Sequence, residues 1–427
     1  MNRSRVAAFF SSLSFFVVAA LVAGVVVGAL AQDADAPLVT SGLGMIEALG
    51  QVWLNALRMT VIPLVFSLLV TGIVSIADAA ATGRMAGRAL MVFAILLVGA
   101  TVYAILAGLG LLQIWPIDPQ AGAALLAGVP ADAAQTVGVA AHTDGFQAFL
   151  ASLAPANLIR AAADDGVLAV VVFAIAFGFA ATQVRQDLRR PLATFFEAVA
   201  EAMVVIVHWV LLAAPFGVFA LALGVGLRAG LGVAGTLGHY VAIVCLSQIG
   251  LILLTYVVAV VWGRIPLGRF ARAVTPAQVV AVSTQSSLAS LPVMIERARE
   301  GLGVPQASAG LVLPLAVAVF RLTSPVANLA VCLYVAQLSG VELGLPALIA
   351  GGLTAIAVSI ASVGLPGQVS FFASVGPICL AMGLPLGVLP LLLAVEVIPD
   401  IFRTVGNVTA DLAATRIVNG PDEAEEA

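Results

Sequence analysis

Lysine is absent from this chain of 427 residues, and all eighteen basic residues are arginine. A Walker A phosphate loop and a Schiff-base catalyst both need a lysine side chain. The sequence therefore excludes both, and we do not expect this chain alone to pump a solute with ATP.

Charged residues make up only 9% of the chain, and 62% of the residues are hydrophobic. An ordinary globular domain carries about 25% charged residues. Apolar runs long enough to cross a bilayer recur along the chain, so we predict an all-α protein that spans the membrane several times. The net charge of −4 gives no indication of a nucleic-acid partner.

Cysteine and histidine are also rare, with three of each. The cysteines stand singly in apolar runs and have neither the CxxC spacing of a metal site nor the density of a disulfide framework. We predict that Cys245, Cys332 and Cys379 pack in the core. The histidines are far apart in sequence and indicate neither a metal site nor a catalytic triad. A serine hydrolase would need a GxSxG motif, which is absent, so we do not expect an enzyme.

Six apolar runs in the first part of the chain are predicted to be helices. The first follows MNRSR and imitates a secretory signal, but it reaches residue 31 and is therefore long enough to span a membrane. The segment 117–165 carries Ala, Gly and Asp and is expected to lie partly outside the membrane. The predicted helices cover residues 6–31, 48–76, 90–112, 167–182, 198–227 and 238–261.

Clusters of arginine orient these helices through the positive-inside rule. If every cluster faces the cytoplasm, each is separated from the next by an even number of crossings, and Arg228 is the one arginine left in an outward loop. We therefore expect a multi-pass protein of the inner cell membrane with both termini in the cytoplasm. The clusters are Arg3/Arg5, Arg84/Arg88, Arg185/Arg189/Arg190 and Arg264/Arg269/Arg272.

Two later apolar segments are interrupted. Residues 276–293 contain a cluster of hydroxyl side chains and return to arginine within too few residues to cross the membrane twice. Residues 348–384 contain a central GLPG, whose glycines and proline cannot continue a helix. We predict two re-entrant hairpins, the first followed by a full helix over 309–338. Interrupted segments in corresponding places indicate an inverted-repeat transporter with its site at the midplane.

A polar stripe follows the second hairpin, after the wholly apolar run 386–395. Its members are spaced by 4, 3, 4 and 4 residues and fall within an arc of roughly 80° on a helix. A charge at bilayer depth costs at least about 2.5 to 3.5 kcal/mol, so these residues must face a partner, a cavity or a substrate. A solvated face of a soluble helix is the alternative. The stripe consists of Glu396, Asp400, Arg403, Asn407 and Asp411.

Three motifs resemble those of the dicarboxylate/amino acid:cation symporter family, the glutamate transporters. They are STQSSLASLPV at 283–293, GLPG at 364–367 and DIFRTVGNVTADL at 400–412. The resemblance extends over nearly the whole chain, through VIPLVFSLLVTGI, VLAVVVFAIAFGFA and APFGVFAL. It implies eight transmembrane helices, two re-entrant helical hairpins, inverted repeats, elevator-type alternating access and a homotrimer.

The resemblance also implies a division of the chain. Residues 1–262 would hold helices one to six, with one, two, four and five as scaffold and with three and six moving with the transport domain. Residues 263–418 would form the transport core, from the first hairpin to helix eight. Residues 419–427 would be a cytoplasmic tail.

The resemblance assigns site residues by their place in the motifs. The hydroxyls of Ser286 and Ser287 would hold the substrate carboxylate, Asp400 its ammonium group, and Arg403 a side-chain carboxylate. These types suit the task, because arginine offers a planar fork to a carboxylate and aspartate accepts from an ammonium. The implied substrate site is Gln285, Ser286, Ser287, Ser324, Gly364, Pro366, Gly367, Asp400, Arg403, Thr404 and Asn407.

One motif departs from the family. Where the family has Asn-Met-Asp-Gly-Thr, this chain has Phe-Arg-Leu-Thr-Ser at 320–324, so that only the last hydroxyl remains, as Ser324. The missing Asn and Asp supply oxygen ligands for sodium in the family, and their loss argues against sodium coupling at two of its sites. Asn407 and Asp411 are the sodium ligands that remain, if any do.

Arg321 lies within the otherwise apolar helix predicted for 309–338 and must be paired or hydrated. Either it snorkels to an interface, or its guanidinium lies near Asp411 or Asp400 and stands in for a sodium ion. In the second case transport would be proton-coupled or uncoupled. Glu396 is then a candidate proton carrier, because burial favours the protonated form of a carboxyl group. The charge-compensating set is Arg321, Glu396, Asn407 and Asp411.

The sequence thus predicts a secondary active symporter that imports an acidic amino acid or a dicarboxylate, with sodium or a proton as the coupling ion and no other cofactor. Keeping both Asp400 and Arg403 favours an acidic amino acid, since its ammonium and distal carboxylate would each have a partner. A carrier of C4-dicarboxylates or of neutral amino acids remains an alternative. So does an anion channel or uncoupled carrier on the same fold.

Overall fold

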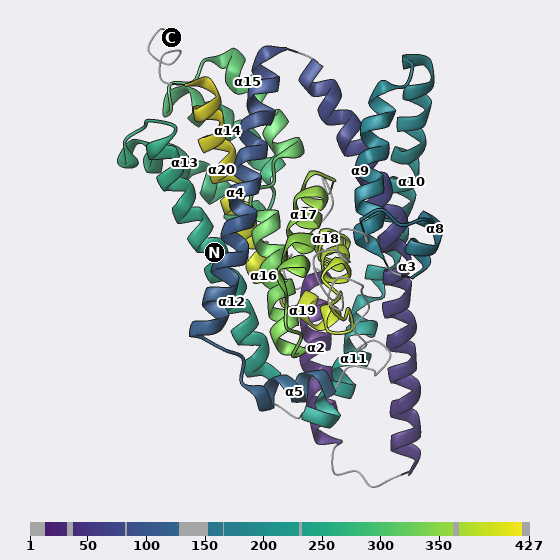
Figure 1. The fold of residues 1–427 in the computed structure, drawn as a ribbon. Helices are drawn as coiled ribbons and strands as arrows, with labels where there is room; N and C mark the ends of the chain where they lie inside the picture. The colour runs from purple at the N-terminus through teal and green to yellow at the C-terminus, as the bar shows by residue number, and fades with distance from the viewer. Residues whose placement is uncertain are drawn as a thin grey trace.

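The computed structural model describes residues 13–31, 37–81, 83–127, 153–164, 166–229, 233–361 and 367–420. Every regular element in these ranges is an α-helix (Figure 1), so the prediction of an all-α protein is confirmed. Five of the described helices are long and apolar enough to cross a membrane.

The first half of the described chain contains nine helices. They are α2 (Leu13–Leu30), α3 (Pro37–Ala81), α4 (Arg84–Ile114), α5 (Pro119–Ala127), α8 (Leu158–Ala163), α9 (Val167–Gln183), α10 (Gln186–Leu212), α11 (Ala214–Ala229) and α12 (Val233–Val261). The second half contains α13 (Leu267–Thr284), α14 (Ser287–Glu300), α15 (Gln306–Val319), α16 (Thr323–Leu338), α17 (Leu345–Ala361), α18 (Gly367–Ala381), α19 (Leu389–Ala394) and α20 (Val397–Asn419).

The single helix predicted over 198–227 is wrong. The structure ends α10 at Leu212 and starts α11 at Ala214, with Ala213 in a turn between them. Pro215, in the first turn of α11, has no N–H to donate back into α10, so the hydrogen-bonding pattern of one helix cannot continue into the next.

Helices α2, α3, α9, α10 and α11 pack together as one group. The crossing of α2 and α11 is close, because a Cβ atom at Gly28 would lie 2.3 Å from the carbonyl oxygen of Leu223. Small residues at such crossings let the backbones of membrane helices approach. This group carries much of the apolar surface in the first half of the chain.

The two interrupted segments fold as two helix pairs. In the first pair, α13 and α14 pack against each other and turn at Gln285, whose φ of 50° is in the left-handed region. Ser286 then starts α14, because its hydroxyl accepts a hydrogen bond from the N–H of Ala289 at 3.2 Å. In the second pair, α17 packs against α18, and residues 362–366, which join them, lie outside the described residues.

The second group of helices surrounds α20. Helices α12, α13, α14, α15, α16 and α4 all pack against it. The first helix pair meets α20 through small side chains, including the buried Ala273, Ala277 and Ala281. This close packing, together with the buried ring of Phe270, fixes the position of α13 relative to α20.

The two helix pairs lie toward opposite ends of the molecule. At one end, Arg416 of α20 donates hydrogen bonds to the carbonyl oxygens of Gly263 and Leu302, which adjoin the first pair. At the other end, the segment 340–343, which leads into the second pair, lies beside residues 109–113 of α4. The division into a scaffold and a moving core concerns motion and stays a prediction.

Candidate functional site

The polar stripe lies where α20 begins. Glu396 is the residue before α20, and Asp400, Arg403, Asn407 and Asp411 follow on the helix itself. The wall opposite them is formed by α12, α15 and α16, which pack against α20. The stripe therefore faces the interior of the helix group that surrounds α20.

Glu396 and Arg403 form a buried ion pair. Their side chains are exposed by only 5% and 4%, and Arg403 Nη2 lies 2.5 Å from Glu396 Oε1. The hydroxyl of Tyr240, on α12, donates to the other oxygen of Glu396 at 2.9 Å. Removing one member of such a pair costs about 3 to 5 kcal/mol, because it leaves an uncompensated buried charge. The pair thus holds Arg403 in a single arrangement.

Arg403 keeps unused capacity for a ligand. Its Nε–H is buried and has no hydrogen-bond acceptor among the described residues. Its Nη1 lies 3.8 Å from Asp400 Oδ1, and the side chain of Asp400 remains 19% exposed. A free guanidinium donor beside a partly accessible carboxylate suits a ligand that carries a carboxylate and an ammonium group.

The hydroxyls of Thr404 and Ser324 form hydrogen bonds within their own helices. The hydroxyl of Thr404 donates to the carbonyl oxygen of Asp400 at 3.0 Å, one helical turn earlier. The hydroxyl of Ser324 accepts from Asn328 Nδ2 at 3.2 Å. Both side chains are buried, and in this arrangement their hydrogen bonds support the helices.

The continuous helix predicted over 309–338 is wrong. The structure ends α15 at Val319 and begins α16 at Thr323, so Arg321 lies in a break between two helices. The cause is the side chain of Asn407 on α20. Its Oδ1 accepts the N–H of Thr323 at 3.1 Å, which in an unbroken helix would bond to a carbonyl one turn earlier.

The break is tied closely to α20. The hydroxyl of Thr323 donates to Asn407 Oδ1 at 2.8 Å and also lies 3.0 Å from the carbonyl oxygen of Arg403. A Cβ atom at residue 406 would meet Thr323 Cγ2 at 2.4 Å, so the approach requires Gly406. On the other side, the ring of Phe320 stacks on Phe93 of α4 with centroids 4.5 Å apart.

Asp411 is the most isolated charge of the stripe. It is 1% exposed, and neither of its carboxylate oxygens has a hydrogen-bond partner among the described residues. Arg321 is the charged side chain of the described part that acts on it electrostatically. The guanidinium of Arg321 is also attracted by Asp400 and repelled by Arg403. The role of Arg321 as a stand-in for sodium stays a prediction.

The tips of the two helix pairs are less closely tied to the stripe. Ser286 caps α14, and neither it nor Ser287 hydrogen-bonds to a side chain of α20 within the described residues. Gln285 is exposed at the turn. In the second pair Gly367 begins α18, whereas Gly364 and Pro366 lie outside the described residues. The roles of these residues stay predictions.

Three residues of the site were not predicted from the sequence. Tyr240 and Gln248 are polar residues within the largely apolar helix α12, and Gln248 donates to the carbonyl oxygen of Pro399 at 3.2 Å. Thr323 stands next to Ser324, which was taken as the only hydroxyl kept from the family motif. A polar residue in the middle of an apolar helix is the signal that could have identified the first two.

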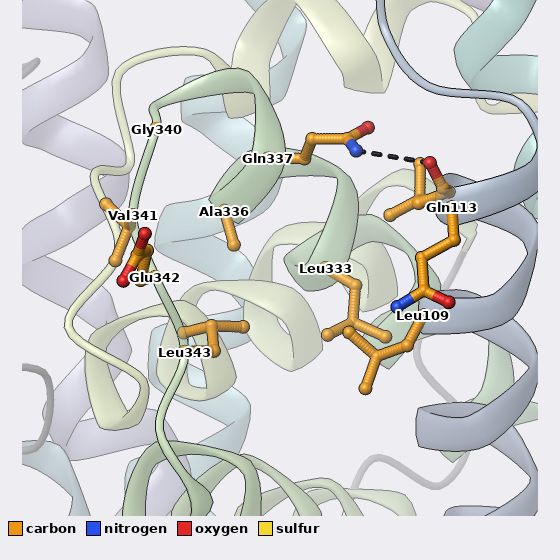
Figure 2. A pocket seen from close by; sticks show the side chains of 10 residues that line it. Leu109, Gln113, Leu333, Ala336, Gln337, Gly340, Val341, Glu342 and Leu343 are labelled. Atoms are coloured by element: carbon orange, nitrogen blue, oxygen red, sulfur yellow. Dashed lines mark hydrogen bonds between the residues drawn. The ribbon is translucent and has the colours of Figure 1, made fainter.

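A cavity of about 390 Å³ lies away from this stripe, between the ends of α4 and α16 and the segment 340–343 (Figure 2). Its lining is mostly apolar and includes Leu109, Leu333 and Leu343, together with Glu342. Gln337 points toward α4, where its amide donates to the carbonyl oxygen of Leu112 at 3.2 Å. None of the predicted site residues lines this cavity.

Comparison with known proteins agrees with the motifs. A family model described as the sodium:dicarboxylate symporter family matches residues 13–420. The proton/glutamate-aspartate symporter of Escherichia coli strain K12 is 26% identical over 422 residues, which cover 95% of this chain and 92% of that protein.

Two further relatives differ in their named ions and substrates. The proton/sodium-glutamate symport protein of Bacillus subtilis strain 168 is 27% identical over 381 residues, covering 88% of this chain and 85% of that protein. A C4-dicarboxylate transport protein of Anaeromyxobacter sp. strain K is 30% identical over 310 residues, covering 71% of this chain and 66% of that protein.

Proposed function

This chain belongs to the sodium:dicarboxylate symporter family of secondary transporters, and we propose that it imports an acidic amino acid together with protons. The observation that carries the proposal is the arrangement at the start of α20. There Arg403 has a buried, unused Nε–H, and Asp400 beside it keeps an accessible carboxylate.

The two side chains match the two ends of the substrate. The distal carboxylate of aspartate or glutamate would bind the Nε edge of Arg403, and the ammonium group would bind Asp400. Hydroxyl and backbone groups at Ser286, Ser287 and the GLPG tip would hold the remaining carboxylate. A C4-dicarboxylate, as named for one relative, would leave Asp400 without its cation.

The proton enters through Glu396. While Glu396 is ionised, it holds Arg403 at 2.5 Å and competes with the substrate carboxylate. When Glu396 takes up a proton, the ion pair is lost. The guanidinium of Arg403 can then bind the substrate carboxylate without competition from Glu396. The titratable and charged groups near Glu396 are Arg403 and Asp400 from α20 and Tyr240 and Cys245 from α12. Substrate and proton therefore bind together.

The setting of this mechanism is the inner membrane. We place both termini in the cytoplasm, because that arrangement puts the arginine clusters inside. The two helix pairs would be re-entrant hairpins, and the helices around α20 would move as an elevator against a trimeric scaffold. Of the five potential spans, α10 has the smallest buried share, because only 17% of its most apolar stretch is buried. Such low burial suits a helix that contacts lipid or another copy of the chain.

Binding of four ligands to purified protein in lipid nanodiscs tests the substrate. We expect aspartate or glutamate to bind at least about tenfold more tightly than succinate, because a charge-assisted hydrogen bond contributes about 1.5 to 3 kcal/mol. Serine, which lacks the distal carboxylate, should bind weakly. Succinate binding as tightly as glutamate would instead favour the dicarboxylate carrier.

The control for this titration is Asp400→Asn. This variant should lose most of its affinity for the amino acids while succinate binding stays within a few-fold, because only the ammonium partner has been removed.

Uptake into proteoliposomes then separates a carrier from a channel: an anion current far larger than substrate flux would favour the channel.

A further inference from the structure

The residues beside the helix break do not fit a sodium ion, which the family's description implies. Sodium needs several oxygen ligands around one point. The Oδ1 of Asn407 is already taken, since it accepts both the N–H and the hydroxyl of Thr323 at 3.1 and 2.8 Å. The carbonyl oxygen of Arg321 accepts the N–H of Ser324 at 3.0 Å. Among the described residues no cluster of acidic, cysteine or histidine side chains could hold a metal ion.

Asp411 nevertheless needs a positive charge. Its carboxylate is buried, and both oxygens lack hydrogen-bond partners in the described part of the chain. An isolated buried carboxylate is very costly unless a cation lies near it or it takes up a proton. Arg321 is the charged side chain that acts on Asp411 within the described residues. The chain thus supplies a cation of its own.

The position of Arg321 is set on both sides. Phe320, 1% exposed, is stacked on Phe93, and Leu322 is 4% exposed. Thr323 is bonded to Asn407, one helical turn before Asp411 on α20. The break between α15 and α16 therefore holds the backbone of the half-buried Arg321 beside α20, one helical turn from Asp411.

We propose that the guanidinium of Arg321 replaces a sodium ion opposite Asp411, as a cation that is covalently part of the chain. The proposal rests on the proposed function for the role of this site in transport. The charge pairing itself can be measured without substrate. The wild-type protein then has no use for sodium at Asp411. Removing the guanidinium leaves a negatively charged vacancy that a small cation can fill.

Thermal unfolding of the full-length protein in detergent, in sodium chloride or in choline chloride at equal ionic strength, tests this inference. We expect the wild-type melting temperature to be the same in both salts. Arg321→Ala should melt at a lower temperature in choline, and added sodium should raise that temperature in a saturable way. A saturable sodium-dependent rise in the wild type would overturn the proposal, as would an Arg321→Ala protein that melts like the wild type in choline.

Two further variants sharpen the result. Arg321→Lys keeps a positive charge and should remain indifferent to sodium. Arg416→Met removes another buried arginine of the same helix group; residue 416 points about 140° away from residue 411 around α20, so sodium should not stabilise this variant. Sodium stabilisation of Arg416→Met to the same extent would show a general salt effect and would contradict the proposal.

If Arg321→Ala does not yield folded protein, the double variant Arg321→Met/Asp411→Asn decides the question. Removing both charges should restore folding that removing only the arginine destroys. A double variant that folds no better than Arg321→Met overturns the pairing. None of these measurements uses a substrate, so failure of glutamate to bind would refute the proposed function and leave this result standing.

Discussion

Glu396 divides its two carboxylate oxygens between Arg403 and Tyr240, which come from different helices. This sharing matters because the ion pair must break and re-form if Glu396 carries the proton. A hydroxyl that donates to an ionised carboxylate stabilises the charged form. Tyr240 therefore helps to keep the pair closed until a proton arrives.

Tyr240→Phe should ease protonation of Glu396, because the substitution removes the hydrogen bond that favours its charged form. We expect the pH dependence of uptake to move toward higher pH, so that more uptake remains at alkaline pH than in the wild type. The stability cost should be about 1.5 to 3 kcal/mol, as for a hydrogen bond to a charged group. Initial uptake rates in proteoliposomes across a pH series measure the shift.

Tyr103→Phe is the matched control. The Tyr103 hydroxyl donates to the carbonyl oxygen of Ser247 at 3.0 Å and has no hydrogen bond to Glu396. This variant should lose less stability, about 0.5 to 1.5 kcal/mol, because its acceptor is neutral, and it should keep the wild-type pH profile. An unchanged profile in Tyr240→Phe, or an equal shift in both variants, would speak against Glu396 as the proton carrier.

At this scale the sequence predicted the members of the stripe, but not Tyr240 as a partner of Glu396. Charged residues after an apolar run at helical spacing are visible in one segment of sequence, and Glu396, Arg403 and Asp411 are indeed buried. Tyr240 lies more than 150 residues away and meets Glu396 only because α12 packs on α20. Such a contact depends on the tertiary arrangement, which one sequence does not reveal.

Among the elements, the predicted helices lie where hydrophobicity alone defines them. The runs 48–76, 90–112, 167–182 and 238–261 fall within α3, α4, α9 and α12. The errors occur at breaks inside apolar runs. At 320–322 the side chain of Asn407 accepts the N–H of Thr323, and Pro325, in the first turn of α16, has no N–H to continue one helix across the break. At 213 the signal in the sequence is Pro215, in the first turn of α11.

Cys332 and Cys379 were predicted to pack in the core; both are buried, and the structure also brings them together. Their sulfur atoms, on α16 and α18, are 3.4 Å apart, and both side chains are fully buried. This contact joins the helix after the break to the second helix pair. The contact therefore shows that α16 packs against α18, which could not be predicted from the sequence.

A membrane-permeant oxidant, such as copper-phenanthroline with oxygen, should form an intramolecular disulfide between Cys332 and Cys379. The reaction couples the two thiols and passes two electrons and two protons to oxygen. Peptide mass spectrometry under non-reducing conditions would detect the linked pair, and both thiols should resist alkylation until a reductant is added. Cys245, on α12, is also buried; as the internal control it should be alkylated once the oxidised protein is denatured without reductant. A link that includes Cys245 would contradict the observed packing of α16 on α18.

The whole molecule moves a defined charge in each cycle. Arg321 and Asp411 remain part of the chain, so their charges move with the protein and are not delivered to either side. If Glu396 is the single proton carrier, the delivered charge is that of one proton plus the substrate. For aspartate or glutamate, which carry one net negative charge near neutral pH, this sum is zero. For succinate, with two negative charges, it is negative.

Uptake driven by an imposed pH gradient should therefore respond differently to membrane potential for the two substrate classes. In proteoliposomes with a potassium diffusion potential set by valinomycin, an inside-negative potential should leave glutamate uptake unchanged, whereas any succinate uptake should slow. One elementary charge moved across 100 mV corresponds to about 2.3 kcal/mol, enough for a large change in accumulation. A sodium-coupled carrier that moved extra positive charge would instead accumulate glutamate faster under the same potential, and would do so only when sodium is present outside.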